Sequence, residues 1–538
     1  MKFVLLPMLL FCFTLQAQPK RSSFNHPKLV VGIVIDQMRY DFLYRYQERY
    51  SSGGFQRLLR EGHSCENTFI NYLPSFTGPG HASIYTGTVP AFHGIAGNDW
   101  TDQLTGKSVY CTADPSVNPV GGSERAGKMS PLNLKATTIT DELRLSTNFQ
   151  SKIIAISLKD RASILPGGHT SSGTYWLDDS LGVFMSSTFY MSRLPDWVQE
   201  FNARDLAGSY MQSGWNTLYP IHSYSQSTPD TNQYEGRFSG ETNSGFPHLL
   251  RGLKKSDIRK TPYGNNLVID FAKEAIQQEK LGQTGNCDFL TLSFSSTDYV
   301  GHQFGPNAVE VEDLYLRLDE ALASFLLYLD QNIGKGQYTL FLTADHGVAH
   351  NPRFMTDRKL PAGYFQSDSL CRELNTFCKK QFGSDRLVRT VSDNYIWLNH
   401  LLLDSLGLSN RQVTESLAPI INRHDEILFA VTPEEFEKLP EPLNKMARNG
   451  YYPNRCGDIL LILQSGWFEA YALTGTTHGN WNPYDTHIPM LWYGWGIEPG
   501  TTLRKTSMTD IAATLASILH IQMPSSCVGS PIPEVIRP

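Results

Sequence analysis

The sequence lacks an excess of positive charge, because 46 lysines and arginines are outnumbered by 52 aspartates and glutamates, for a formal net charge of −6 at pH 7. A nucleic-acid backbone is therefore not an expected partner. The eight cysteines form no CxxC pair, which argues against a cysteine-ligated zinc site. After the N-terminal segment, no apolar run is long enough to span a bilayer of about 30 Å.

The first residues have the pattern of a signal peptide. Residues 1–17 contain one lysine, then an apolar run, then the small residue Ala17, which is the usual order in a secretory signal. We therefore expect cleavage near Ala17 or Gln18 and an exported mature chain, periplasmic or secreted, with no stable membrane anchor. Export permits disulfides, and the short spacing of Cys371 and Cys378 favours a bridge between them.

Four apolar, β-branched runs have the composition of buried strands, and each leads into a charged residue. In chain order these residues are Asp36, Lys159, Asp298 and Asp345. Amphipathic helical patterns alternate with the runs, so the sequence predicts an α/β doubly wound fold with a mostly parallel central sheet and helices on both faces. Because ligands bind at the carboxyl ends of such strands, we expect the four charged residues to share a site.

The domain organisation is predicted to be simple. Residues 18–538 are expected to form one domain, with no internal repeat and no low-complexity linker. Two stretches interrupt the alternation of strands and helices, one near 165–245 and one near 350–460. We interpret both as insertions or cap elements on a single core.

Histidines lie close to two of the strand-end carboxylates. Asp298 and His302 are four residues apart, so they face one direction if the chain is helical there, and His346 directly follows Asp345. Two more histidines, His478 and His487, lie in a short stretch near the C-terminus. Together with Asp36 these residues could supply two metal sites. Carboxylate and imidazole ligands suit zinc, with manganese and iron as alternatives.

Thr77 lies in a Gly/Pro-rich elbow, "SFTGPGH", just before a predicted helix. A helix start favours a phosphate through its free N–H groups and its dipole. No neighbouring Ser-His-Asp or Cys-His pattern is present to activate the hydroxyl. The ordered set of Thr77, the strand-end aspartates and the histidines resembles the alkaline phosphatase superfamily, and in particular the branch that nucleotide pyrophosphatase/phosphodiesterases share with PafA-type alkaline phosphatases.

This resemblance implies an alkaline-phosphatase-like fold, two Zn²⁺ ions and no separate Mg²⁺ site. It also implies that Thr77 is the nucleophile, bound to a metal that lowers the pKa of its hydroxyl, and that the reaction passes through a phospho-threonine. His478 is preferred over His487 because members of the family place the ligand in a His-Gly dipeptide. The implied ligand sets are Asp36, Thr77, Asp345 and His346 for one metal, and Asp298, His302 and His478 for the other.

Lys159 and Arg161 are two residues apart, so an extended strand would point both cations the same way. They could engage the extra charged oxygen of a phosphate monoester, and the resemblance implies that Asn98 donates an amide N–H to the same group. We therefore predict a broad-specificity hydrolase of small phosphate monoesters. The alternatives are a phosphodiesterase or nucleotide pyrophosphatase, a phosphoryl transferase, and a non-catalytic secreted metal- or phosphate-binding protein. A sulfatase is disfavoured because Thr77 is followed by Gly-Pro-Gly-His rather than a Cys/Ser-x-Pro-x-Arg motif.

Overall fold

The computed structural model describes residues 26–103, 105–470 and 472–537. The predicted signal peptide, residues 1–17, and its cleavage site near Ala17 or Gln18 lie outside these residues. In the described part of the chain, no helix is both long and apolar enough to cross a membrane.

The centre of the fold is a run of five parallel strands within a larger sheet. Their spatial order is β11 (Tyr338–Thr343), β1 (Leu29–Ile35), β10 (Asp288–Phe294), β7 (Ile153–Ser157) and β8 (Gly173–Asp178). Every neighbouring pair is parallel, and every residue in the five strands is buried. Apolar, β-branched runs form such strands because both faces of the sheet are covered.

Shorter strands extend the sheet at both edges. Beyond β11 lie β18 (Met490–Gly494), β2 (His63–Cys65) and β19 (Gly500–Thr502), and beyond β8 lie β9 (Val183–Ser187) and β6 (Pro119–Val120). The pairs β11–β18 and β8–β9 are antiparallel, so the sheet is mixed but mostly parallel at its centre. Both β8 and β9 fall within the stretch 165–245 and belong to the main sheet.

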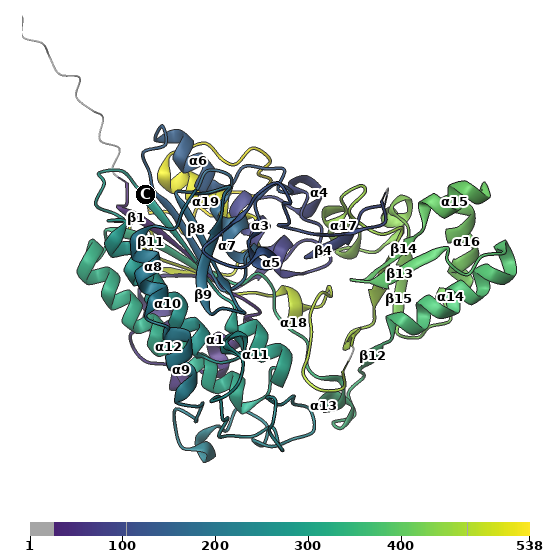
Figure 1. Ribbon diagram of the computed structural model, residues 1–538, viewed down its shortest axis with the longest axis horizontal. Helices are drawn as coiled ribbons and strands as arrows, with labels where there is room; N and C mark the ends of the chain where they lie inside the picture. Colours follow the sequence, from purple (N-terminus) through teal and green to yellow (C-terminus); the bar gives the residue numbers. More distant parts are fainter. Residues whose placement is uncertain (1–25, 104, 471, 538) are drawn as a thin grey trace, which may run out of the picture.

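Helices cover the two faces of this sheet, as predicted (Figure 1). One group contains α10 (Tyr263–Gln278) and α12 (Val309–Leu329), and α10 packs on β10 and β7. The other contains α3 (Thr77–Thr86), α6 (Ile139–Ser146), α7 (Arg161–Gly167) and α19 (Asp510–Leu519), and α7 packs on β7 and β8. The doubly wound α/β prediction is therefore confirmed.

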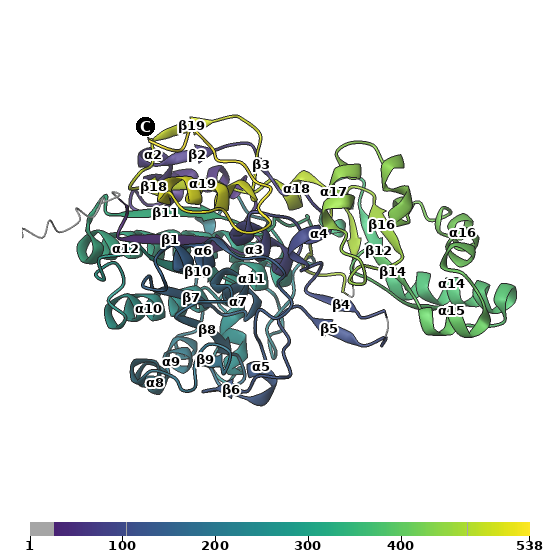
Figure 2. The ribbon, with the colours of Figure 1, turned by 90° about the horizontal axis from the view of Figure 1, so that it is seen from above.

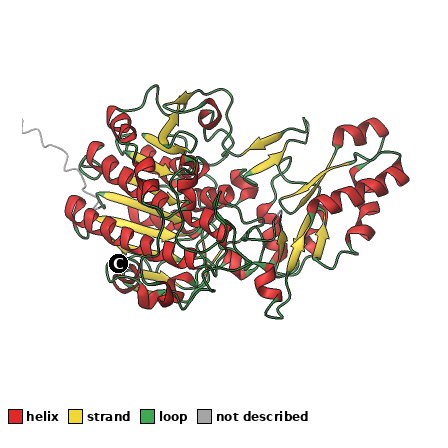
Figure 3. Cartoon of the chain, turned by 60° about the horizontal axis from the view of Figure 1, so that its bottom comes forward, coloured by secondary structure: helices red, strands yellow, loops and turns green. Residues whose placement is uncertain are grey.

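Part of the stretch 350–460 forms a lobe that lies beside the main sheet in both views (Figures 1 and 2). Its four-stranded sheet has the order β13 (Val388–Ser392), β14 (Tyr395–Leu398), β16 (Ile459–Leu463) and β15 (Ile427–Val431). The helices α14 (Ser367–Phe382), α15 (His400–Leu406) and α16 (Asn410–Ile421) accompany this sheet. The lobe has a hydrophobic core of its own, and Figure 3 shows its helices and strands apart from those of the main body.

The predicted bridge between Cys371 and Cys378 is wrong, because both cysteines are free and both lie on α14. Seven residues along an α-helix span about 10 Å, which exceeds the Cα separation of about 4.4–6.8 Å in a disulfide.

The remaining elements are short and connect the parts already described. The helices are α1 (Phe42–Arg45), α2 (Phe55–Glu61), α4 (Pro90–His93), α5 (Glu124–Gly127), α8 (Asp196–Ala203), α9 (Leu206–Gln212), α11 (Ser296–Phe304), α13 (Pro352–Thr356), α17 (Leu443–Gly450) and α18 (Pro483–Thr486), with η1 (Gln47–Arg49), η2 (Ile221–Ser223), η3 (Lys255–Lys260), η4 (Asp330–Gly334) and η5 (Pro433–Lys438). The strands are β3 (Thr68–Phe69), β4 (Asp99–Thr101), β5 (Ser108–Tyr110), β12 (Gly363–Phe365), β17 (Trp467–Glu469) and β20 (Thr506–Ser507).

Candidate active site

Four neighbouring strands bring four charged side chains together at one edge of the sheet. Asp36 directly follows β1, Asp345 follows β11, Lys159 follows β7, and Asp298 lies in the first turn of α11, which follows β10. Each of the four is at most 3% exposed. Parallel strands present their carboxyl ends at the same edge, so the convergence expected from the sequence is present in the structure.

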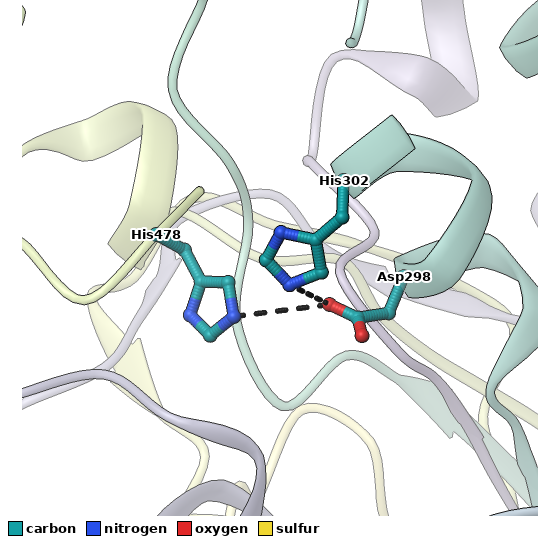
Figure 4. Close-up of side chains that lie close together, drawn as sticks. All are labelled: Asp298, His302 and His478. Carbon is teal, nitrogen blue, oxygen red and sulfur yellow. Dashed lines mark ion pairs between the residues drawn. The ribbon is translucent and has the colours of Figure 1, made fainter. Parts of the chain in front are cut away.

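One group of candidate metal ligands is formed by Asp298, His302 and His478 (Figure 4). Nε2 of His302 lies 3.1 Å from Oδ1 of Asp298, and Nε2 of His478 lies 3.7 Å from the same oxygen. Each ring is oriented through Nδ1, which lies 2.8 Å from the carbonyl of Thr476 for His302 and 2.8 Å from that of Ser75 for His478. In the neutral ring this leaves the Nε2 lone pair facing the carboxylate, as a metal ligand requires.

A second group contains Asp36, Asp298 and His346, whose ligand atoms lie within 4.8 Å of one another. Nε2 of His346 lies 3.5 Å from Oδ1 of Asp36 and 3.6 Å from Oδ2 of Asp345. The His346 ring stacks on that of His478, with 3.5 Å between the ring centroids. The two groups are therefore adjacent, and Asp298 lies within reach of both.

Thr77 is the first residue of α3 and is 1% exposed. Its Oγ1 lies 3.4 Å from Nε2 of His346. The helix approaches the cluster closely because Gly80 has no side chain, since a Cβ there would lie 2.6 Å from the Cβ of Asp345. The packing of α3 thus places the threonine hydroxyl beside the carboxylates and histidines.

Asn98 lies just before β4, and its Oδ1 accepts a hydrogen bond of 2.8 Å from the backbone N–H of Gly78. Its amide N–H groups are therefore the part that can donate to a ligand. The first turn of α3 offers fewer free donors than expected, because the Gly78 N–H is engaged, Pro79 has none, and the Gly80 N–H donates to the Phe76 carbonyl at 2.9 Å. The dipole of the helix still favours an anion at this end.

The expected extended geometry at Lys159 and Arg161 is wrong. The strand β7 ends at Ser157, Asp160 has helical φ and ψ of −55° and −50°, and α7 begins at Arg161. The two cations instead lie on a strand-to-helix turn. Nη1 of Arg161 donates to the hydroxyl of Tyr110 at 3.0 Å. The stretch "SLKDRAS" contains no sequence pattern that marks a helix start at Arg161. An extended segment is therefore what the sequence predicts there.

Lys159 lies between two carboxylates of the cluster. Its Nζ donates to Oδ2 of Asp36 at 2.6 Å and to Oδ2 of Asp298 at 2.6 Å. The lysine is 3% exposed, so these two contacts compensate a buried charge.

Sequence reasoning missed two residues that orient the cluster. The backbone N–H of Gln37 donates to Oδ1 of Asp345 at 3.2 Å, and its Nε2 donates to Oδ1 of Asp298 at 2.7 Å. His81 places Nδ1 3.0 Å from the carbonyl oxygen of Thr77 and 3.2 Å from Oδ2 of Asp345. The spacing of His81, four residues after Thr77, is a signal that could have identified it. Gln37 has no signal beyond its place next to a strand-end aspartate.

The carboxylates of the cluster differ in their proton affinity. Burial and repulsion by Asp345 raise the pKa of Asp36 well above its usual range. Burial also acts to raise the pKa of Asp298, but His302 and Lys159 outweigh it and hold that pKa well below its usual range. The cluster thus gathers more buried carboxylate than one lysine can compensate.

The residues present fit a bound cation. Oδ1 of Asp36 is buried and has no hydrogen-bond partner among the described residues. Oδ2 of Asp345 is also buried and accepts no hydrogen bond from them, although Nδ1 of His81 lies 3.2 Å away. Burial and the neighbouring rings of His346 and His302 lower the pKa of His478 well below its usual range, which favours the neutral ring that ligates metals. Since an unsatisfied buried oxygen is costly, a metal ion would complete the contacts of these atoms.

His487 lies outside this cluster. Its Nε2 is 3.0 Å from the carbonyl oxygen of Glu66, and its ring stacks on Tyr40 and Phe69 with centroid separations of 4.0 Å and 4.6 Å. These contacts give His487 a role in packing behind the site.

Comparison with known proteins places the chain in a family. The model of the type I phosphodiesterase / nucleotide pyrophosphatase family matches residues 30–485, and the chain belongs to this family. Within it, the chain is 47% identical to alkaline phosphatase PhoV of Synechococcus elongatus over 98% of each chain, and 46% identical to alkaline phosphatase PafA of Elizabethkingia meningoseptica over 96% of each chain. The resemblance to PafA-type alkaline phosphatases is therefore confirmed.

The solved structure of PafA has a TM-score of 0.93 with this chain and covers 95% of this chain and 99% of PafA. The alkaline-phosphatase-like fold is thereby confirmed. A further relative, from Myroides odoratus, is 49% identical over 98% of each chain and is named a calcium-transporting ATPase.

Proposed function

We propose that this chain is an exported alkaline phosphatase, which hydrolyses small phosphate monoesters of varied structure and releases inorganic phosphate through a phosphorylated Thr77. The observation that carries the proposal is the meeting of Thr77, Lys159 and three buried aspartates at one edge of the sheet. The similarity to PhoV and PafA over almost the whole chain supports it.

Two zinc ions would be held by the residues of the cluster, with no separate magnesium ion. Asp36, Thr77, Asp345 and His346 would hold one ion, and Asp298, His302 and His478 the other. When bound, zinc supplies positive charge that lowers the pKa of a threonine hydroxyl and offsets the charge of phosphate oxygens.

Thr77 acts as the nucleophile in this proposal. Oγ1 loses its proton and forms a bond to phosphorus as the ester P–O bond breaks, and the leaving oxygen takes up a proton and departs as the alcohol. Water then attacks phosphorus, the bond to Thr77 breaks, and the threonine hydroxyl is restored. The position of Thr77 at the start of α3 supports this role, because the helix dipole favours the phosphate there.

Lys159, Arg161 and Asn98 would bind the non-bridging oxygens. A monoester dianion has one more charged oxygen than a diester, and two cations beside the cluster would favour it. A variant of PafA with a solved structure, 44% identical to this chain, carries substitutions of a Thr, an Asn, a Lys and an Arg in that order. Thr77, Asn98, Lys159 and Arg161 follow the same order of residue types.

The test uses the zinc-loaded mature protein and measures phosphate release from phenyl phosphate. Thr77→Ala should lower kcat by at least about 10³-fold, because removing a nucleophile abolishes the covalent route, and acid-quenched samples of the variant should contain no phosphoprotein. Thr86→Ser, in the same helix, is the control. Unchanged turnover in Thr77→Ala, or in the double variant Lys159→Ala/Arg161→Ala, would contradict the proposal.

A further inference from the structure

A cavity of about 200 Å³ opens beside the catalytic cluster. Lys159 and Arg161 line it at the turn between β7 and α7, and Tyr299 of α11 lines it next to Asp298. Its outer wall includes Arg125 of α5 and Arg259 of η3. The cavity therefore shares two cations with the site proposed to bind the phosphoryl group and has two more beyond them.

Two of the arginines that line the cavity, Arg161 and Arg259, each have one donor that no described protein group accepts. The Nε–H groups of Arg161 and Arg259 are buried and have no acceptor among the residues that the structure describes. A buried charged donor without an acceptor is costly. Two such donors around one cavity point to an anionic ligand with oxygen acceptors.

The carboxylates around the cavity leave this positive charge only partly compensated. Asp160 also lines the cavity; among the described residues it forms no ion pair, and its oxygens accept from the hydroxyls of Tyr110 at 2.8 Å and Thr112 at 2.6 Å. Asp179 forms an ion pair with Arg259 and lies 3.7 Å from Arg125. One carboxylate thus faces two arginines at the outer wall.

Tyr299 links the outer wall to the catalytic lysine. Nζ of Lys159 lies 5.0 Å from the centroid of the Tyr299 ring, and the guanidinium carbon of Arg259 lies 4.7 Å from the same centroid. The two cations are therefore separated by no more than the sum of these two distances. A small molecule with two charged groups has the dimensions to reach both.

We propose that this cavity is a subsite for a second anionic group, a carboxylate or a phosphate, carried by the leaving group of the substrate, and that Arg259 is its main contact. The inference rests on the proposed function, because it assumes that the first phosphate is held at Thr77, Lys159 and Arg161. Asp179 competes with the ligand for Arg259. Substrates with two anionic groups would therefore be preferred over equally large substrates with one.

The test compares two esters of matched size, 4-carboxyphenyl phosphate and 4-carbamoylphenyl phosphate, on the full mature protein loaded with zinc. The measured quantity is the ratio of kcat/KM for the charged ester to kcat/KM for the neutral ester. Differences in leaving-group chemistry are the same for every variant, so they cancel when ratios are compared. Arg259→Met should lower the ratio about fivefold, because a partly exposed charged contact is lost.

Two further variants separate binding from structural support. Arg259→Lys keeps the positive charge, so its ratio of kcat/KM values should stay close to that of the unaltered protein. Asp179→Asn removes the competing carboxylate and should raise this ratio. Arg204→Met is the matched control, because Arg204 pairs with Glu274 at 3.1 Å but does not line the cavity. The subsite would be overturned if Arg259→Met had the same ratio of kcat/KM values as the unaltered protein. It would also be overturned if Arg204→Met lowered the ratio as much as Arg259→Met does. A lack of turnover of both esters would instead overturn the proposed function.

Discussion

Nζ of Lys159 lies 2.6 Å from Oδ2 of Asp36, a residue 123 positions earlier in the chain. The same ammonium group lies 2.6 Å from Oδ2 of Asp298. Lys159 thus compensates two carboxylates that are also candidate metal ligands. Its contribution to stability should therefore depend on whether a metal ion is bound.

Lys159→Met should lower the free energy of unfolding of the metal-free protein by about 3 kcal/mol, because it leaves two buried carboxylates without their cation. The loss should be smaller in the zinc-loaded protein, where metal charge replaces that of the lysine. Urea unfolding with and without a chelator measures both values. Lys152→Met is the control, because Lys152 pairs with Glu279 but is 36% exposed, and it should cost at most about 1 kcal/mol in both states. An equal loss for Lys159→Met in both states would contradict this role.

The two histidines near the C-terminus should differ in their effect on metal content. His478→Ala should lower the bound zinc measured after equilibrium dialysis, because it removes a ring that faces Asp298. His487→Gln should retain the zinc and cost about 1 kcal/mol of stability, because it disrupts stacking on Tyr40 and Phe69. Loss of zinc in His487→Gln with retention in His478→Ala would show that the ligand assignment is reversed.

Glu235 should make stability depend on pH. Burial and repulsion by Glu310 raise the pKa of Glu235 to about 9, so the folded protein binds this proton more tightly than the unfolded chain. The resulting stabilisation is complete below about pH 4.5 and is lost as the pH rises toward about 9.

Glu235→Gln cannot ionise and should therefore gain stability relative to the unaltered protein by at least about 2 kcal/mol between pH 5 and pH 9. Urea unfolding across this range measures the difference. Glu415→Gln, at a side chain that is 63% exposed, is the control and should leave the pH profile unchanged. A difference between Glu235→Gln and the unaltered protein that stays constant with pH would contradict the raised pKa.

The strand ends could be predicted from the sequence because buried parallel strands read as apolar runs, and Asp36, Asp298 and Asp345 each close or follow one. Parallel topology then brought these residues to one edge of the sheet. The pair Lys159 and Arg161 was correctly placed near this edge. Its geometry was not predictable, because the helical conformation of Asp160 is set by the packing of α7 on β7 and β8.

The remaining differences arise from tertiary contacts. Gln37 contacts both Asp298 and Asp345 and has a positive backbone φ of 67°, and the local sequence pattern predicts neither feature. The spacing of Cys371 and Cys378 suggested proximity, but a helix separates residues seven positions apart. The four-stranded sheet of the lobe includes strands that are far apart in the sequence. The spacing of hydrophobic residues alone does not predict which of these strands pair.

The central claim is that Lys159 and Arg161 make this active site selective for monoesters. The most direct measurement is kcat/KM of the zinc-loaded protein for phenyl phosphate and for methyl phenyl phosphate, the matching diester. The account predicts that the monoester is preferred by about a hundredfold or more, since each charge-assisted contact to the extra oxygen contributes about 1.5 kcal/mol. A preference for the diester would leave the fold and Thr77 in place but would contradict the role assigned to the two cations.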